Sequence, residues 1–168
     1  MIDYDRSALR AELSRDEGRR TKPYFDSKGI KTVGVGWNLQ ANGIPAEVQA
    51  ILGLSLRDLQ QAYNIDYEWP EAAIDKLLDI GIARAEAGLD GLLTRWRDMD
   101  AVRQRVCLNL CFNMGAKTLS EFKRTLTAIA HGDWEAAARG MSESLWAREV
   151  GPRATRLIAM METGEAPA

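Results

Sequence analysis

The sequence predicts an α+β protein that is mostly helical, with a small region of strands near its N-terminus. Side-chain types alternate along the segment from Ile30 to Val35, as they do in a β-strand. A second, shorter strand is predicted before it, at Tyr24-Phe25. From residue 70 to residue 164, apolar residues instead recur at helical spacing, and residues that begin or end helices separate the runs. A chain of 168 residues fits one domain with a sizeable core, in one body or in two lobes.

The strand region follows directly on a first helix. Apolar residues at helical spacing predict this helix over residues 5–17, and Gly18 ends it. Ser27-Lys28-Gly29 is a glycine-containing turn that joins the two strands as a hairpin. Gly34 and Gly36 are unusual inside a strand, and they indicate that another backbone or a ligand comes close.

Further helices are expected in the rest of the chain, after a polar loop from Gln40 to Pro45. They cover residues 45–52, 56–65, 70–92, 100–114, 121–130, 134–142 and 152–163. The helix over residues 100–114 is apolar nearly all round after Arg105, which indicates that it is buried on most sides. Gly115 is its expected stop.

Composition and charge exclude several classes of function. The net charge of −2 gives no bulk attraction to polyanions, so no nucleic acid partner is expected. No apolar run reaches the roughly 18 residues of a membrane span, so no membrane insertion is expected. The N-terminus lacks the basic and apolar regions of a signal peptide, so we expect the protein to be cytoplasmic when it is made.

Cysteine and histidine usage gives no sign of a metal or other cofactor. Cys107 and Cys111 lie four residues apart in an apolar helical pattern, and we expect them to be buried thiols. No further Cys and no suitably spaced His supports a metal site. His131 is the only histidine and is interpreted as a helix C-terminal residue, so a His-based nucleophilic triad would have to use it.

Two acids and a hydroxyl are the candidate catalytic groups. Glu17 ends the first helix, Asp26 precedes the hairpin turn, and Thr32 begins the alternating strand. Two carboxylates that flank the substrate are what hydrolysis of a glycosidic bond requires. The negative end of a helix dipole disfavours an anion, which suits Glu17 as a general acid. Taken alone, the pattern also fits a helix-end Glu and an ordinary turn Asp.

The spacing Glu-x8-Asp-x5-Thr followed by Val-Gly-Val-Gly resembles the catalytic signature of the phage-type lysozymes, glycoside hydrolase family 24. The resemblance covers most of the chain, strongly at residues 16–37 and 100–164 and loosely at 38–99. It implies a lysozyme-like fold in a single domain over residues 1–168. In that fold a small catalytic lobe with a β-hairpin takes about residues 14–70, a long connecting helix takes 71–92, and a larger helical lobe takes 1–13 and 93–168.

The resemblance also implies roles for the three groups. Glu17 would be the general acid that protonates the oxygen between N-acetylmuramic acid and N-acetylglucosamine. Asp26 would stabilise positive charge on the sugar and help orient the attacking water, which Thr32 would hold by a hydrogen bond. The family inverts the anomeric centre, which needs carboxylates about 6.5–9.5 Å apart.

Other positions match residues that line the family's substrate cleft. For Phe112 the match competes with simple core packing, whereas Asn113 needs a polar partner, either the substrate or a backbone group. Arg153 matches an arginine that contacts the catalytic Glu, or is a surface charge at a helix start. The remaining substrate-binding candidates are Thr125 and Asn38.

Three positions depart from the family's T-even members. Trp37 replaces a histidine, Asn38 replaces an apolar cleft residue, and Gly140 replaces a cleft asparagine, so the sugar contacts are expected to differ.

The implied function is that of an endolysin, a monomer that cuts the glycan strands of peptidoglycan. It would be made in the host cytoplasm, pass through a separate holin-like export route, and act in the periplasm. A catalytically silent glycan-binding module of a phage tail and a lytic transglycosylase are the alternatives. Intact Glu17, Asp26 and Thr32 argue against the first, and a water held by Asp26 and Thr32 argues against the second.

Overall fold

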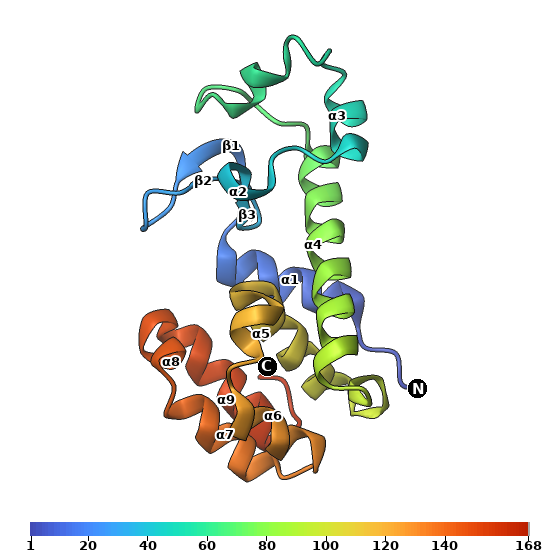
Figure 1. Cartoon of the computed structure of the whole chain (residues 1–168), viewed down its shortest axis with the longest axis vertical. Helices are drawn as coiled ribbons and strands as arrows, with labels where there is room; N and C mark the ends of the chain where they lie inside the picture. Colours follow the sequence, from blue (N-terminus) through green and yellow to red (C-terminus); the bar gives the residue numbers. More distant parts are fainter. Residues whose placement is uncertain (168) are drawn as a thin grey trace. The chain divides into compact units, whose positions relative to one another are not determined.

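A computed structural model describes residues 1–167 of the chain, and Figure 1 shows the order of its helices and strands. The chain divides into two compact units. Unit 1 comprises Met1–Leu9 together with the chain from Ala83 onward, and unit 2 comprises Arg10–Ile82. Unit 2 carries a three-stranded antiparallel sheet and unit 1 is helical, so the predicted mostly helical α+β class is confirmed. No helix of residues 1–167 is long and apolar enough to cross a membrane.

The first helix, α1, runs over Arg6–Glu17 and confirms the helix predicted there. The carboxylate of Asp5 accepts a hydrogen bond from the backbone N–H of Ala8 at 2.9 Å, which satisfies one of the open donors of the first turn. Gly18, with φ 79°, turns the chain out of the helix. Glu17 is therefore the last helical residue, as predicted.

The sheet has the strand order β1-β2-β3. Strand β1 covers Arg20–Phe25, β2 covers Lys31–Gly34 and β3 covers Trp37–Asn38. The register places Tyr24 opposite Thr32 and Thr32 opposite Asn38. The hairpin predicted for the first two strands is confirmed. The third strand was not predicted, because its two residues are too few to show an alternating pattern.

The rest of unit 2 is made of short helices. Helix α2 covers Leu39–Asn42, where the sequence predicted a loop, and α3 covers Ala46–Leu52, close to the prediction. The helix expected over residues 56–65 is instead a short 3-10 helix, η1, at Leu59–Tyr63. These segments pack on one apolar cluster whose larger members are buried Val33, Trp37, Leu39, Val48, Trp69, Ile74 and Leu77.

The long helices of the chain begin close to where the sequence predicts them. Helix α4 covers Glu71–Leu92, the 3-10 helix η2 covers Trp96–Asp98, and α5 covers Ala101–Leu119. Gly115 has non-helical φ 81° and ψ 157°, so the predicted stop is real, and a short further turn follows it within α5. Every residue from Gln104 to Cys111 is buried, which confirms the burial predicted for this helix.

Four helices complete unit 1. They are α6 at Lys123–Ala130, α7 at Trp134–Ser142, α8 at Leu145–Val150 and α9 at Pro152–Thr163. Helices α7 and α9 have the predicted bounds, and α6 begins two residues later than expected. Helix α8 was not predicted, although the side chain of Ser144 caps it by accepting from the N–H of Ala147.

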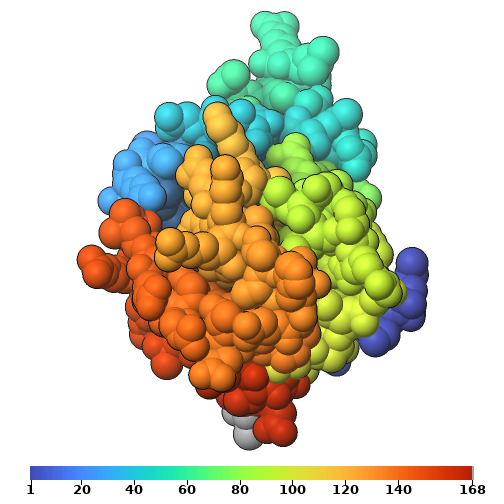
Figure 2. Space-filling model, turned by 60° about the horizontal axis from the view of Figure 1, so that its bottom comes forward, coloured from blue at the N-terminus to red at the C-terminus, as the bar shows by residue number. Residues whose placement is uncertain are grey.

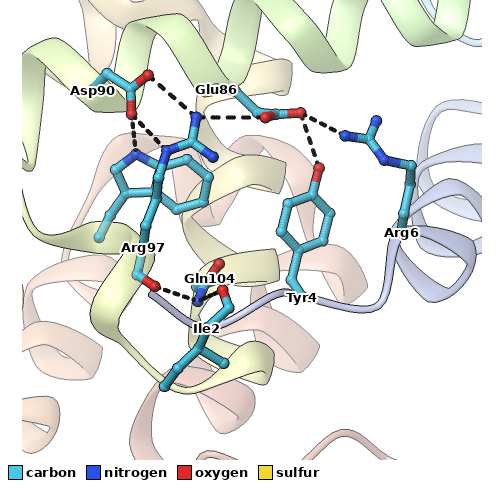
Figure 3. Close-up of polar contacts among 8 residues, drawn as sticks. Ile2, Tyr4, Arg6, Glu86, Asp90, Arg97 and Gln104 are labelled. Carbon is cyan, nitrogen blue, oxygen red and sulfur yellow. Dashed lines mark hydrogen bonds and ion pairs between the residues drawn. The ribbon is translucent and has the colours of Figure 1, made fainter.

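The N-terminal segment is fixed to later parts of unit 1 by a polar network (Figure 3). Tyr4 donates its phenolic hydrogen to Glu86 at 3.0 Å, and Arg97 lies 3.5 Å from the other oxygen of the same carboxylate. Burial, and then the nearby Glu86 charge, raise the pKa of Tyr4 to about 12, so the phenol remains a donor at neutral pH. The side-chain amide of Gln104 donates to the carbonyl of Ile2 at 2.8 Å.

Both cysteines are buried free thiols, as predicted. Burial raises the pKa of Cys107 to about 12 and also raises the pKa of Cys111. The thiols therefore stay protonated at neutral pH and act as small packing groups.

Candidate active site

The hairpin between β1 and β2 fixes Asp26 and Thr32 through one residue, Ile30. Asp26 Oδ1 accepts from the backbone N–H of Lys28 at 2.8 Å and from that of Ile30 at 2.9 Å. The hydroxyl of Thr32 donates to the carbonyl oxygen of Ile30 at 2.9 Å. Both side chains are thus held by the backbone of a tight turn, which leaves them little rotational freedom.

The hydrogen bond of Thr32 also decides what its hydroxyl can offer. A hydroxyl has one hydrogen and two lone pairs, and the hydrogen is given to Ile30. Thr32 Oγ1 can therefore act only as an acceptor toward any further group. Asp26 Oδ2 has no hydrogen bond within residues 1–167 and is likewise an acceptor.

Tyr24 connects these groups to Glu17. It lies opposite Thr32 in the β1–β2 register, and Asp26 follows two residues later, just after the end of β1. The pKa of Tyr24 is raised, mainly by burial, and the charges of Glu17 and Asp26 both add to the effect. The guanidinium of Arg20 stacks 4.3 Å from the centre of the Tyr24 ring and lowers that pKa in turn. Both carboxylates are therefore close enough to act on one phenol.

Glu17 is held against the turn between β2 and β3. Gly36, with φ 65°, passes so close that a Cβ atom on it would lie 2.9 Å from Glu17 Oε2 and 3.2 Å from its Cδ. The sequence predicted a close approach at this glycine, and its partner is the side chain of the candidate acid. Gly34 meets the side chain of Ile74 in a similar way, at 3.3 Å. Unit 2 thus carries Asp26 and Thr32 at the β1–β2 hairpin and Glu17 at the β2–β3 turn of the same sheet.

Asn38 and Trp37, also in unit 2, have structural partners. Asn38 Oδ1 accepts from the N–H of Ala41 at 2.8 Å and so caps α2, and the residue faces Thr32 across the β2–β3 pair. Trp37 is buried and its indole donates to the carbonyl of Gly43 at 2.9 Å. The family's histidine at this place is thus replaced by a core residue.

The other predicted site residues lie in unit 1. Phe112 is half-buried near the C-terminal end of the main segment of α5. Asn113 follows it and accepts a hydrogen bond from the indole of Trp146 at 2.8 Å. This partner is neither of the two that the sequence suggested, because a side chain 33 residues away supplies it.

Arg153 is buried, with 6% of its surface exposed, so the interpretation as a surface charge is wrong. Its Nε and one terminal nitrogen donate to Asn109 Oδ1 at 2.9 and 2.7 Å. Asn109 belongs to the buried stretch of α5, so this bond fixes the start of α9 on that helix.

Thr125 is 3% exposed, and Gly140 on α7 packs directly against its hydroxyl. A Cβ atom at Gly140 would collide with Thr125, so the departure from asparagine noted at Gly140 permits close packing of α6 and α7. This burial argues against direct contact between Thr125 and a glycan.

Sequence reasoning assigned no role to Tyr24 or Arg20. A signal was present, because Tyr24 stands two residues before Asp26 at the start of the predicted hairpin. Stacking of Arg20 on Tyr24 depends on the local backbone and could not be read from spacing.

No group of three or more His, Cys, Asp and Glu side chains within residues 1–167 is placed to hold a metal ion. The candidate site is instead made of two carboxylates and a hydroxyl acceptor on an α1–hairpin junction. Two carboxylates are the groups that acid-assisted glycoside hydrolases use.

Comparison with known proteins narrows this class. The profile of the phage lysozyme family matches residues 14–159. "Probable T4-type lysozyme 2" of Dictyostelium discoideum is 29% identical over 163 residues, which are 94% of this chain and 95% of that protein. The "Pre-baseplate central spike protein Gp5" of Enterobacteria phage T4 is 27% identical over 90% of this chain, which spans 27% of that protein. The "Endolysin" of Salmonella phage P22 is 34% identical over 40% of this chain and 45% of its own length.

The chain belongs to the phage lysozyme family. It is a glycoside hydrolase, a lysozyme, and its substrate class is peptidoglycan.

Proposed function

We propose that the enzyme hydrolyses the β-1,4 bond between N-acetylmuramic acid and N-acetylglucosamine, with inversion at the anomeric carbon. Glu17 protonates the glycosidic oxygen as the bond breaks. Asp26 stabilises the positive charge that develops on the sugar. A water molecule held by Thr32 and Asp26 attacks the opposite face of the ring.

The observation that carries this proposal is that Thr32 donates its only hydroxyl hydrogen to the carbonyl oxygen of Ile30. A nucleophilic water must direct a lone pair at the anomeric carbon, so its hydrogens must go to acceptors. Thr32 Oγ1 and Asp26 Oδ2 are two such acceptors on one hairpin. A transglycosylase needs no held water, so two acceptors there favour hydrolysis.

We propose Phe112, Asn113 and Asn38 as contacts for the glycan. The Phe112 ring offers an apolar face for a sugar, and an amide side chain such as that of Asn113 or Asn38 can both donate and accept hydrogen bonds. Thr125 is better explained as a packing residue, because it is buried under Gly140. Arg153 holds Asn109 and the start of α9, and its predicted role in supporting Glu17 stays part of the proposal.

We propose an endolysin role, in which a monomer made in the host cytoplasm reaches the periplasm by a separate holin-like route and lyses the cell. The spike protein Gp5 contains a related segment within a much longer chain, which makes a virion-associated lysozyme the second candidate. The Dictyostelium relative shows that proteins of this type are not confined to phages.

Product analysis tests the chemistry. Peptidoglycan is digested in water enriched in ¹⁸O and the fragments are analysed by mass spectrometry and, at early times, by NMR. We expect reducing muramic acid ends that carry one ¹⁸O and form first as the α anomer. Anhydro ends would show a transglycosylase, the β anomer would show retention, and the absence of products would leave a glycan-binding module.

Glu17→Gln tests the acid. The amide keeps the size of the side chain but has no proton to donate to the leaving oxygen, and general acid catalysis contributes about 10²–10⁴-fold. We expect loss of lysis of permeabilised cells with an unchanged melting temperature. A residual rate above about a tenth of wild type would remove Glu17 from this role.

A further inference from the structure

Arg20 and Tyr24 form a pair of hydrogen-bond donors on the sheet that carries the candidate catalytic groups. Tyr24 lies directly opposite Thr32 in the β1–β2 register, so these two side chains share one face of the sheet. The guanidinium carbon of Arg20 lies 4.3 Å from the centre of the Tyr24 ring, which is within the range of a cation–π contact. Figure 2 shows the blue part of the chain, which includes this hairpin, at the surface of the molecule.

The guanidinium of Arg20 is not used by any acid of the fold. Within residues 1–167, Arg20 makes no hydrogen bond or ion pair besides its contact with the Tyr24 ring. Its neighbour Arg19, by contrast, pairs with Glu71 at 2.5 Å and with Asp75 at 3.0 Å. Arg20 is exposed, so its N–H donors are open to a ligand while the ring limits where the side chain can move.

The hydroxyl of Tyr24 is a second open donor. It makes no hydrogen bond within residues 1–167, although the side chain is half-buried. No fully buried side-chain oxygen or nitrogen of those residues lacks a partner, so this hydroxyl reaches solvent. The pKa of Tyr24 is raised, mainly by burial, and the phenol therefore keeps its hydrogen at neutral pH.

These donors differ in kind from the acceptors that hold the water. Thr32 Oγ1 and Asp26 Oδ2 can take the hydrogens of a water molecule. A guanidinium can only donate, and its charge does not help bond cleavage, because positive charge develops on the sugar. The Arg20 cation is therefore suited to an anionic substituent of the substrate. Muramic acid carries such a substituent, since its lactyl group is linked to a peptide with free carboxylates.

We propose that Arg20 and Tyr24 are specificity-determining residues that bind a carboxylate of the peptide on muramic acid. This inference rests on the proposed function, in which the glycan is cut beside this hairpin. A guanidinium can bind a carboxylate through two parallel N–H···O bonds, and the phenol can add another. A peptide-free glycan offers no such anion, so the enzyme prefers strands that carry their peptides.

Three forms of one soluble glycan test this preference. The first keeps its peptides, the second has lost them to an amidase, and the third keeps peptides whose carboxylates are converted to amides. We expect the kcat/KM of wild type to be about tenfold higher or more on the first form than on the other two. Most of the difference should lie in KM, because the carboxylate is bound equally in the ground state and the transition state. Equal kcat/KM on the first and third forms would overturn the proposal.

Variants locate the recognition on the two side chains. R20Q should lower the ratio of kcat/KM for peptide-bearing over peptide-free strands by about tenfold or more. Y24F keeps the ring beside Arg20 and loses only the hydroxyl, so it should lower this ratio by about 2–10-fold. The control K22Q removes the same charge from the same strand, where Lys22 is exposed and lies 3.9 Å from Glu68, and it should change the ratio less than about twofold.

Two outcomes of the variant assays would contradict the proposal. Equal loss of the ratio in R20Q and K22Q would show general attraction of charge. A fall of kcat by the same factor on all three glycans in R20Q would show that Arg20 supports the catalytic groups and does not select the substrate. Failure of the proposed function gives a different result, because wild type would then cleave none of the three glycans.

Discussion

Replacing Gly36 by alanine should disable the enzyme while sparing the fold. The new Cβ would lie 2.9 Å from Glu17 Oε2, 3.2 Å from Cδ and 3.3 Å from Cβ. The two closest atoms, Oε2 and Cδ, move when the Glu17 side chain rotates, whereas the contact with Cβ needs a backbone shift of a few tenths of an ångström. The backbone also pays for a side chain at φ 65°, about 1–2 kcal/mol.

The expected size of the effect follows from that geometry. A displacement of about 1 Å in a catalytic group can cost about 10²-fold in rate, which corresponds to about 2.7 kcal/mol of transition-state stabilisation. We therefore expect kcat/KM on soluble peptidoglycan to fall by about 10–10²-fold, and the free energy of unfolding in urea to fall by only about 1–2 kcal/mol.

Two other glycines provide the controls. Gly53 has a similar φ, 67°, with nothing within 4 Å of a new Cβ, so Gly53→Ala measures the cost of a side chain at positive φ without a collision. Gly34→Ala, with φ 66°, adds a contact with the apolar Ile74 at 3.3 Å and tests steric pressure away from the acid. Both should lose stability and keep activity. If Gly36→Ala is as active as Gly53→Ala, Glu17 is not held by this turn or is not the acid.

Further predictions concern the nucleophile, the core and the thiols. Thr32→Glu should place a carboxylate where the water is held, so that a covalent glycosyl-enzyme accumulates and appears in the intact mass; wild-type hydrolysis without an adduct would place residue 32 away from the anomeric carbon. Gly88→Ala would bring a Cβ to 2.9 Å from Cys111 Sγ. We expect this variant to lower the unfolding free energy in urea by about 1–2 kcal/mol. The control Gly91→Ala, whose new Cβ has nothing within 4 Å, should raise the unfolding free energy by up to about 1 kcal/mol. A stabilised Gly88→Ala would show that α4 and α5 can separate. Because the folded pKa of Cys107 is raised to about 12, its contribution to stability is complete below the unfolded pKa of about 8.5 and is lost as pH rises toward the folded value. The unfolding free energy should fall there by up to about 1.4 kcal/mol per pH unit, and Cys107→Ala should show a shallower slope.

Local signals in the sequence were enough for the parts of the fold that depend on neighbours along the chain. Asp100, Asp133 and Pro152 mark helix starts because a cap or a fixed φ acts within one turn, and α5, α7 and α9 begin there. The short elements β3, α2 and α8 were missed, because two to six residues carry too little periodicity.

For the site, the residue types and their spacing could be predicted, but the partners could not. The bonds from Trp146 to Asn113 and from Arg153 to Asn109 join residues 33 and 44 apart, and only the packing of helices decides them. Gly36 was recognisable as a point of close approach, yet nothing in a single sequence says that the approaching group is Glu17. The acceptor role of Thr32 also depends on a turn geometry that brings Ile30 O within 2.9 Å.

The division of unit 1 into two chain segments sets an order of assembly during synthesis. Tyr4 meets Glu86 across 82 residues, and Ile2 meets Gln104 across 102. At about 5–20 residues per second, the ribosome needs roughly 4–20 s between making the two halves of these contacts. Unit 2 is continuous and lies wholly within that interval, so its sheet and core can form while the first nine residues still wait for their partners. The region that holds the candidate acid and the hairpin is therefore able to fold before residues 1–9 have their partners.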